Sequence, residues 1–391
     1  MTADSALMPT YGRYPLRLVR GEGTRVWDER GSAYLDFAGG IAAMPLGHSH
    51  PAWIRAVTDQ AASLTHVSNL FSTEPQEQLA ARLAALSGLD SVFLANSGAE
   101  ANEAALKIAR KHGLANGGLE VVALEGSFHG RTFATLAATG QPHKHAPFAP
   151  LPGGFVHVPP GDAEALGDAV GPRTAAILLE PVLGEGGILP LEPEYLAEAR
   201  RLCDEHGALL MLDEVQTGVG RCGSWFAFQR LGVTPDVVTL AKGLGGGLPI
   251  GACLSRVELA FGPGEHASTF GGGPVPSAGA LAVLSTIEAE GLIENCLLRG
   301  QELMEGLAES GAAGLAEVRG MGLLIGAEFV DERAGAVVRA LIDLGFLATE
   351  AGPRVVRFAP PLSVTAEEAA KLVAAFPLAA RSADGLARAA S

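Results

Sequence analysis

The sequence is poor in cysteine, and no two cysteines have the spacing of a metal-binding pair. Its 391 residues contain four scattered cysteines, Cys203, Cys222, Cys253 and Cys296. This pattern predicts reduced thiols and gives no reason to expect a zinc site. The chain also has no apolar run long enough to span a membrane, and its N-terminus lacks the apolar core of a secretion signal. We therefore expect a soluble, cytoplasmic protein.

Positive charge is also scarce, because only 28 lysines and arginines stand against 43 aspartates and glutamates. The net charge of −15 and the isoelectric point near 5.1 disfavour nucleic acid and anionic membranes as partners. A small anionic substrate would have to be bound by a few local arginines against this overall field. With 48% hydrophobic residues, the chain can bury a large core and should form more than one structural region.

Several ligand-binding patterns begin in this sequence but are incomplete. The glycines of the GLGGG run follow Lys242, whereas a P-loop places its lysine after the glycines. The GEG at residues 21–23 resembles the start of a dinucleotide fingerprint, but Val26 stands where the third glycine is needed. His48 and His50 lack a third ligand, so we interpret them as structural and expect no metal.

The most informative feature is a pair of buried-strand patterns that end in charged residues. The apolar run at 208–212 ends in Asp213, and the run at 237–240 leads to Lys242. In open α/β sheets, ligands bind outside the carboxyl ends of the strands, so both side chains should face one crevice. Pyridoxal phosphate chemistry uses such a pair, with the lysine binding the cofactor covalently and the acid pairing with its ring nitrogen. Taken singly, each residue could instead be a helix cap or a solvated charge.

A longer stretch around this pair resembles a known family. Residues 213–252, DEVQTGVGRCGSWFAFQRLGVTPDVVTLAKGLGGGLPIGA, resemble the signature of the class III (omega) aminotransferases, which are pyridoxal-phosphate enzymes of fold-type I. The segments LMPTY at 7–11, FAGGIAAMPLGHSHP at 37–51 and VRFAPPL at 356–362 are most similar to the acetylornithine branch of that family. The resemblance covers nearly the whole chain.

The resemblance implies an α/β fold with two domains. The large cofactor-binding domain, residues 46–278, should hold a mixed, mostly parallel sheet flanked by helices. A smaller α+β domain should combine residues 1–45 and 279–391. The family also forms homodimers with shared active sites, and this implies that Thr269 reaches the cofactor phosphate of the neighbouring subunit. Gly273 departs from the family, which usually has asparagine there, so the geometry of this subunit contact is open.

Five further positions are expected to bind the cofactor. Ser97 and Glu100 have the spacing of a capping box after a strand pattern at 91–95, and a helix N-terminus is a ready anion site. The segment could be only a well-capped helix, but the resemblance assigns the phosphate to Ser97, Gly98 and Ala99. It also assigns ring stacking to Phe128 and places Gln216 near the ring hydroxyl.

Three charged residues are expected to bind the substrates. The resemblance assigns Arg131 to the substrate carboxylate that is remote from the reacting amine. Glu185 of a GEGG loop should pair with Arg357, masking it while an ω-amine binds and releasing it for 2-oxoglutarate. A fixed structural ion pair is the alternative explanation for these two residues.

The expected function is transfer of the ω-amino group of N-acetylornithine to 2-oxoglutarate by a ping-pong mechanism. This reaction gives N-acetylglutamate semialdehyde and glutamate and belongs to arginine biosynthesis. The alternatives are aminotransferases for succinylornithine, 4-aminobutyrate, ornithine or carrier-bound lysine, and a pyridoxal-phosphate aminomutase. Ile41 stands where ornithine δ-aminotransferases tend to have tyrosine, which argues against free ornithine.

Overall fold

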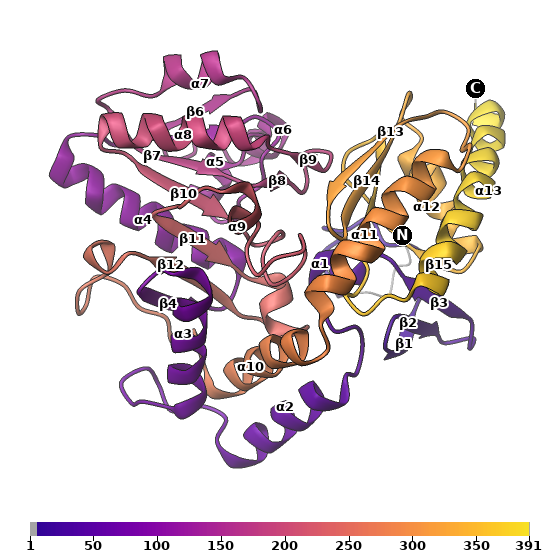
Figure 1. Ribbon diagram of the computed structural model, residues 1–391, viewed down its shortest axis with the longest axis horizontal. Coiled ribbons are helices and arrows are strands. Elements are labelled where there is room, and N and C mark those ends of the chain that lie inside the picture. The colour runs from indigo at the N-terminus through magenta and orange to yellow at the C-terminus, as the bar shows by residue number, and fades with distance from the viewer. Residues whose placement is uncertain (1–5, 391) are drawn as a thin grey trace.

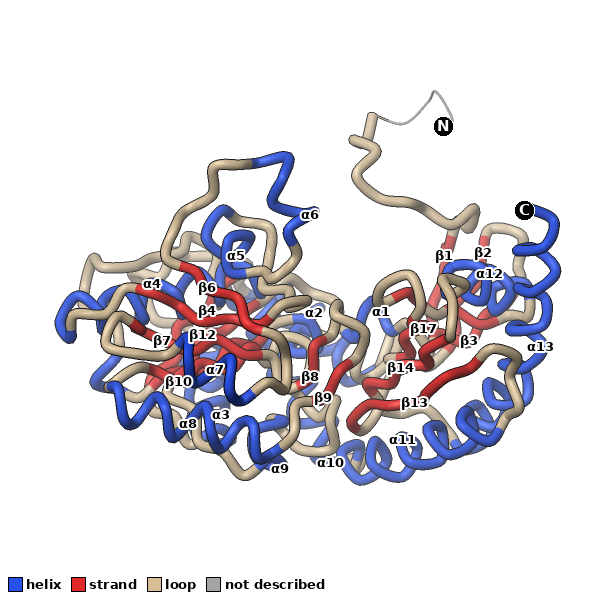
Figure 2. The backbone as a smooth tube through the Cα atoms, turned by 90° about the horizontal axis from the view of Figure 1, so that it is seen from above, coloured by secondary structure: helices blue, strands red, loops and turns tan. Residues whose placement is uncertain are grey.

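The computed structural model describes residues 6–390, with the side chains of residues 384–390 outside the description. The chain forms a larger α/β region and a smaller α+β region that lie side by side (Figure 1). Both ends of the described chain belong to the smaller region, and the first residues run away from it as an extended segment (Figure 2). Within the described residues, no helix is both long enough and apolar enough to cross a membrane.

The larger region is built on a seven-stranded sheet in the order β4-β12-β11-β10-β7-β5-β6. The strands are β4 (Ser91–Ala95), β5 (Glu120–Leu124), β6 (Phe155–Val158), β7 (Thr174–Leu179), β10 (Leu209–Asp213), β11 (Val237–Leu240) and β12 (Gly251–Ser255). β10 is parallel to β7 and β11, and β5 is parallel to β6 and β7, whereas β12 is antiparallel to β4 and β11. The predicted mixed, mostly parallel sheet is confirmed.

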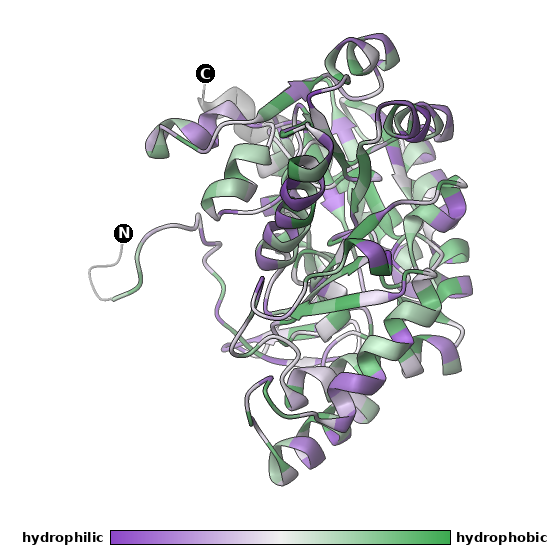
Figure 3. Ribbon diagram, turned by 90° about the vertical axis from the view of Figure 1, so that its left-hand side faces the viewer, coloured by the Kyte–Doolittle hydropathy of each residue, from purple (hydrophilic) through white to green (hydrophobic). Residues whose placement is uncertain are grey.

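Helices cover both faces of this sheet, and each face has its own packed core. α4 (Gly98–Asn116) lies on one face and α8 (Pro193–His206) on the other. Successive residues of a strand point to opposite faces, so Met211 belongs to the core under α4 while Leu210 and Leu212 belong to the core under α8. The strands are therefore continuous apolar runs, and Figure 3 shows hydrophobic colour concentrated on the sheet and hydrophilic stretches on the outer helices.

Shorter elements complete the larger region. The α-helices are α2 (Pro51–Ser63), α3 (Glu74–Ser87), α5 (Phe133–Ala138), α6 (Pro142–His145), α7 (Ala163–Ala169), α9 (Ala227–Leu231) and α10 (Pro274–Ala289). The 3-10 helices are η1 (Ala146–Phe148), η2 (Lys242–Gly245) and η3 (Val257–Leu259). α10 packs against α2 and α3, so the predicted domain boundary at 278/279 falls inside a helix that contacts the larger region. The division into two domains at that residue stays a prediction.

The smaller region contains two four-stranded sheets and three helices. One sheet joins β1 (Leu18–Glu22), β2 (Arg25–Asp28), β3 (Ala33–Asp36) and β15 (Phe346–Leu347). The other joins β13 (Leu315–Met321), β14 (Leu324–Phe329), β17 (Val355–Phe358) and β16 (Thr349–Glu350). The helices are α11 (Leu292–Glu309), α12 (Ala334–Asp343) and α13 (Ala366–Ala390), and a short helix α1 (Gly39–Ala42) follows β3.

A small two-stranded hairpin of the larger region contacts the smaller region. β8 (Val182–Leu183) and β9 (Leu189–Pro190) form a two-stranded sheet directly after β7. β9 contacts β13 of the smaller region, and Figure 2 shows the hairpin between the large sheet and β13. The residues in the turn of this hairpin are thereby placed beside β17.

Candidate active site

Asp213 and Lys242 line one cavity of about 510 Å³ at the carboxyl ends of β10 and β11. Asp213 is the last residue of β10, and Lys242 begins η2 two residues after β11. The two strands are parallel neighbours, so the chain brings both side chains to one edge of the sheet. Lys242 has a φ of 41°, a left-handed conformation that costs energy in a residue with a side chain.

Burial changes the protonation chemistry of Lys242. Removal from water lowers the pKa of its amine, and the positive charge of Arg357 acts in the same direction. The negative charges of Glu185, Asp213 and Glu180 oppose this effect and raise the pKa. A buried lysine with a lowered pKa has a larger neutral fraction, which is the form that acts as a nucleophile or a base.

Asp213 is held by donors from three directions. Asn102 Nδ2 of α4 donates to Asp213 Oδ2 at 2.7 Å, and His129 Nδ1 lies 2.8 Å from the same oxygen. The backbone N–H of Val215 donates to Oδ1 at 3.0 Å. Asn102 is itself fixed, because its Oδ1 accepts a hydrogen bond from Thr239 Oγ1 at 2.7 Å. These contacts fix the orientation of the carboxylate of Asp213, which lines the cavity.

His129 is a buried partner of Asp213 that the sequence did not indicate. Burial favours the neutral imidazole, but the hydrogen bond and charge of Asp213 outweigh it and raise the pKa of His129. Its Nε2 is buried and has no hydrogen-bond partner among the described residues. The only sequence signal was its position directly after Phe128. Asn102 gave an equally weak signal in the sequence, as a polar residue near alanines. In the structure it is buried in α4.

The N-terminus of α4 forms one wall of the cavity. Ser97 is the N-cap, and its hydroxyl accepts a hydrogen bond from the backbone N–H of Glu100 at 3.2 Å. The backbone N–H of Asn96, one residue before the N-cap, donates to the carboxylate of Glu100 at 2.6 Å. Gly98 packs so closely that a Cβ atom there would lie 2.9 Å from the methyl groups of Val215. Ser97, Gly98 and Ala99 therefore bring an anion-binding helix end against the segment that follows Asp213.

Phe128 also lines the cavity and is positioned by Glu180. The backbone N–H of Phe128 donates to Glu180 Oε1 at 2.8 Å, and the N–H of Gly184 donates to Oε2 at 3.1 Å. Burial raises the pKa of Glu180 to about 7, against the opposing charge of His129. Glu180 ends the β7 segment and had no predicted role. It fixes the loop that carries Phe128 to the loop that carries Glu185.

Arg357 of β17 belongs to the smaller region and contacts Gln216, which lines the cavity. One of its terminal nitrogens donates to Glu185 Oε1 at 2.5 Å, to the Gly184 carbonyl at 3.0 Å and to Gln216 Oε1 at 3.2 Å. Its Nε donates to Thr349 Oγ1 at 3.1 Å. The predicted trio of Glu185, Arg357 and Gln216 is thus brought together at the junction of the two regions.

Arg131 and Thr269 lie in different surroundings. Arg131 lines the cavity, and its guanidinium carbon lies 5.4 Å from the centre of the Phe128 ring. Thr269 does not line this cavity but a separate hollow of about 810 Å³ that also contains Asn69 and Phe93. Within one chain, Thr269 is therefore not brought to Lys242. Gly273, the departure from the family pattern, is the N-cap of α10.

The donors around the cavity fit pyridoxal phosphate. A helix N-terminus can bind the phosphate, Asp213 can pair with a protonated ring nitrogen, and Phe128 offers a flat face to the ring. The buried amine of Lys242 can bind the aldehyde carbon. Among the described residues, no cluster of histidine, cysteine or acidic side chains could hold a metal ion.

Comparison with known proteins identifies relatives over nearly the whole chain. The aminotransferase class-III family model matches residues 7–379. An acetylornithine aminotransferase from Mycolicibacterium smegmatis is 51% identical over 377 residues, covering 96% of each chain. Another from Thermosynechococcus vestitus is 50% identical over 383 residues, covering 93% of this chain and 92% of that protein.

The solved structures to which the chain is similar are also aminotransferases. An ornithine aminotransferase from Toxoplasma gondii, with partial occupancy of PLP at its active site, superposes with a TM-score of 0.94 at 32% identity. That match covers 98% of this chain and 93% of the other. An N-acetylornithine aminotransferase from Stenotrophomonas maltophilia superposes with a TM-score of 0.83 at 37% identity, covering 97% of this chain and 98% of the other. The matches span both regions of the fold.

Proposed function

Because the chain belongs to the class III aminotransferases, pyridoxal-phosphate enzymes, we propose that it transfers the ω-amino group of N-acetylornithine to 2-oxoglutarate. The products are N-acetylglutamate semialdehyde and glutamate, which assigns the enzyme to arginine biosynthesis. Support for this substrate comes from relatives about half identical over nearly their full length that bear the name acetylornithine aminotransferase. A solved N-acetylornithine aminotransferase adds to that support.

The residues of the cavity suit distinct parts of the cofactor. In this proposal Lys242 binds the aldehyde carbon, Asp213 pairs with the ring nitrogen, and Phe128 stacks on the ring. Gln216 lies by the ring hydroxyl. The phosphate binds to Ser97, Gly98 and Ala99 at the start of α4. When bound, pyridoxal phosphate supplies an electron sink for the carbon that carries the reacting amine.

The chain itself contributes charge placement and proton transfer. Asp213 is oriented by hydrogen bonds from Asn102 and the N–H of Val215, so in this proposal it would hold a proton on the ring nitrogen. The amine of Lys242, neutral more often because it is buried, can accept a proton from the substrate carbon that bears the amine. His129 and Asn102 act through Asp213 and are positioning residues.

The observation that carries the assignment of an ω-amine donor is the Glu185–Arg357 pair. An amino donor that reacts at its ω-amine has no carboxylate beside the reacting carbon, whereas 2-oxoglutarate has one. Arg357 is 2% exposed and fixed by three further acceptors, while the side chain of Glu185 is 29% exposed. Glu185 is therefore the partner that can move, masking Arg357 for the amine and releasing it for the oxo acid.

We also propose that the enzyme is a homodimer in which Thr269 of one subunit approaches the cofactor phosphate of the other. Large apolar side chains are exposed near Thr269, namely Leu70 at 87%, Phe71 at 66% and Phe270 at 63%. Such a patch suits a protein–protein interface. Asn96 Nδ2, next to the phosphate-binding residues, donates to Ser268 Oγ at 3.1 Å and ties this segment to the site. The four cysteines are buried and free, which supports a cytoplasmic location.

Free ornithine is the second candidate donor, because an ornithine aminotransferase superposes with the higher TM-score of 0.94. Its identity of 32% is well below the 51% of the acetylornithine relative. Ile41, at the position where ornithine δ-aminotransferases tend to have tyrosine, also favours an acylated donor. Succinylornithine, 4-aminobutyrate and carrier-bound lysine also react at a free ω-amine but differ from N-acetylornithine in the rest of the molecule.

A donor screen tests the proposal. Purified enzyme with 2-oxoglutarate is assayed for glutamate formation from N-acetylornithine, succinylornithine, ornithine, 4-aminobutyrate and lysine, with Lys242→Ala as the background control. We expect N-acetylornithine to have the highest kcat/KM by at least tenfold, equivalent to about 1.4 kcal/mol of transition-state preference. If another donor leads, the substrate assignment is wrong. If no donor reacts above the Lys242→Ala background, the aminotransferase reaction itself is contradicted.

A further inference from the structure

Two positive side chains from different segments lie against the same aromatic ring of the active-site cavity. The guanidinium carbon of Arg131 is 5.4 Å from the centre of the Phe128 ring, and Lys144 Nζ is 6.0 Å from it. Arg131 belongs to the loop between β5 and α5, whereas Lys144 belongs to α6. Only the first of these two cations was expected from the sequence.

Lys144 is held in this place by its own surroundings. Its ammonium donates to Gln141 Oε1 and lies 3.2 Å from His143 Nε2. The amide of Gln141 donates to the carbonyl of Ser127 at 3.0 Å and to that of Gly126 at 3.3 Å. Gln141 thus ties Lys144 to the loop that carries Phe128. The ammonium has three donors, and these two partners leave one of them for a ligand.

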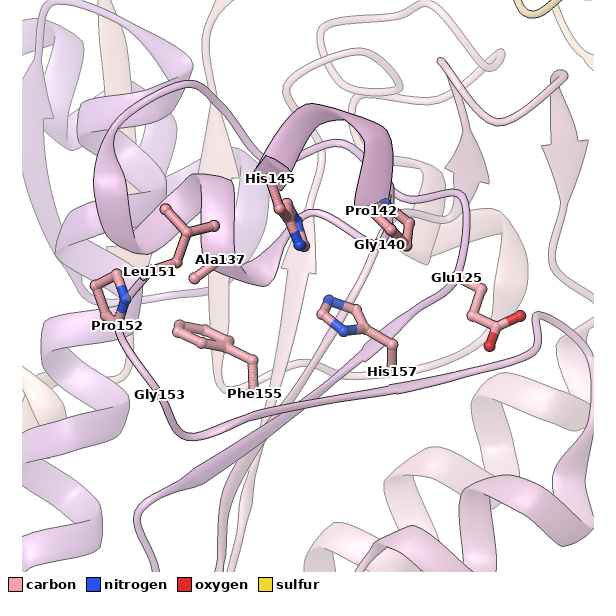
Figure 4. Close-up of a pocket in the computed structure, with 10 residues that line it drawn as sticks. All are labelled: Glu125, Ala137, Gly140, Pro142, His145, Leu151, Pro152, Gly153, Phe155 and His157. Atoms are coloured by element: carbon pink, nitrogen blue, oxygen red, sulfur yellow. The ribbon is translucent and has the colours of Figure 1, made fainter. Parts of the chain in front are cut away.

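The rest of α6 has a different environment. Pro142 and His145 line a second cavity of about 540 Å³, together with Phe155 and His157 of β6. In Figure 4, these residues surround the cavity with α6 above it. Lys144 does not line that cavity, although its neighbour His145 does. Lys144 does not line the active-site cavity either, but its ammonium lies 6.0 Å from the centre of the Phe128 ring, which does line that cavity.

The charge around this ring is uncompensated. Although the chain has 43 acidic and 28 basic residues, neither Arg131 nor Lys144 forms an ion pair with a carboxylate of the described part of the chain. Arg357, the third cation near the cavity, has Glu185 as its partner. Burial and the positive charge of Arg131 lower the pKa of Lys144, and the negative charge of Glu185 raises it. Two cations without a carboxylate form a site prepared for an anion.

We propose that Lys144 is a specificity-determining residue that, together with Arg131, binds the substrate carboxylate remote from the reacting carbon. This inference rests on the proposed function and deepens it. For the amino donor, the ligand is the α-carboxylate of an N-acylated ω-amino acid. For 2-oxoglutarate, it is the carboxylate that does not bind Arg357. Binding of either anion relieves the repulsion between the two cations, so the pair favours carboxylated donors over uncharged ones.

The test compares two donors that differ only in that carboxylate, N-acetylornithine and N-acetyl-1,4-diaminobutane. Single-turnover rates of the holoenzyme with each donor are measured for the wild type, Lys144→Met, Lys144→Arg and Arg131→Met. Lys371→Met is the matched control, because Lys371 is paired with Glu367 on the distant helix α13. We expect Lys144→Met to lower kcat/KM for N-acetylornithine about tenfold, mainly through KM.

The other measurements distinguish a role of Lys144 in substrate binding from a role in supporting the loop that carries Phe128. The rate with N-acetyl-1,4-diaminobutane should stay within about twofold of wild type in Lys144→Met, and the KM for 2-oxoglutarate should rise. Lys144→Arg should restore most of the preference for the carboxylated donor. Equal losses with both donors would show that Lys144 only supports the loop, and no loss with either would also overturn the inference. If the screen finds another leading donor, that donor and its decarboxylated counterpart test Lys144 in the same way.

Discussion

Glu185 and Arg357 form an ion pair of 2.5 Å between the β8–β9 turn and β17. The pair joins the two regions of the fold directly beside the cavity that holds Lys242. Its two members differ in freedom, because Arg357 is bound by Gly184, Gln216 and Thr349 while Glu185 is partly exposed. In the proposed function, this asymmetry makes Glu185 the member of the pair that moves between the two half-reactions.

The first prediction concerns the carboxylate of Glu185 that pairs with Arg357. Glu185→Gln removes the negative charge and leaves Arg357 free to bind any α-carboxylate. The half-reaction with N-acetylornithine should lose about tenfold in kcat/KM, and the half-reaction with glutamate should gain, because only glutamate has a carboxylate beside its reacting amine. Both are followed by the absorbance of the cofactor in single turnovers. Glu367→Gln, at an exposed helix pair, is the control. A change of both half-reactions by one common factor would indicate a fixed structural pair.

The second prediction concerns pH. Binding of the cofactor requires the neutral amine of Lys242, so its rate should rise with pH up to the pKa of that lysine. Because burial lowers this pKa, the rise should end below the pH at which an exposed lysine loses its proton. The charge of Glu185 raises the pKa and that of Arg357 lowers it. Glu185→Gln should therefore move the midpoint to lower pH, and Arg357→Gln should move it to higher pH.

Stopped-flow binding of pyridoxal phosphate to the apoenzyme measures these midpoints without any substrate. Removing a surface charge outside the cavity should not shift these pH midpoints, and Glu367→Gln is the control variant for this expectation. Shifts of the two variants in the same direction would refute the assigned electrostatics.

The third prediction concerns Asp213. Asp213→Asn keeps the side-chain shape but removes the charge that holds a proton on the ring nitrogen. The variant should fold and bind cofactor in a 1:1 ratio, yet lose about 10²-fold or more in kcat, a loss typical of a missing electrostatic partner in a water-excluded site. Thr239→Val is a graded control, because its hydroxyl is 3.5 Å from Asp213 and acts mainly through Asn102. It should lose less than about tenfold. Equal activity of Asp213→Asn and wild type would exclude the proposed role.

Local patterns predicted the strands and the shared crevice well. The expected strands at 91–95, 208–212 and 237–240 each agree with the structure to within one residue at either end. Buried strands are apolar on both faces, and Asp213 and Lys242 at the ends of their runs mark where the sheet meets the cavity. The sheet order could not be predicted in this way. β12 lies between β4 and β11, and that pairing depends on contacts between distant parts of the sequence.

The residues that the sequence did not reveal act through tertiary contacts. Asn102, His129 and Glu180 became visible as partners of Asp213 and Phe128 only once four separate segments met at the cavity. In the sequence, Lys144 is only one polar residue of the short PHKH segment. Its proximity to the Phe128 ring depends on how α6 folds. The role of Thr269 requires a second subunit, so a single chain leaves it a proposal.

Trapping of the cofactor tests the central claim most directly. Borohydride reduces a bond between a lysine and pyridoxal phosphate to a stable form, which peptide mass spectrometry then locates. The sequence has only five lysines, Lys107, Lys111, Lys144, Lys242 and Lys371, so the assignment is unambiguous. We expect the yellow holoenzyme to bleach and the modification to lie on Lys242, and we expect Lys242→Ala to be folded, unmodified and slower by at least about 10². Modification of another lysine, or substantial turnover by Lys242→Ala, would contradict the account.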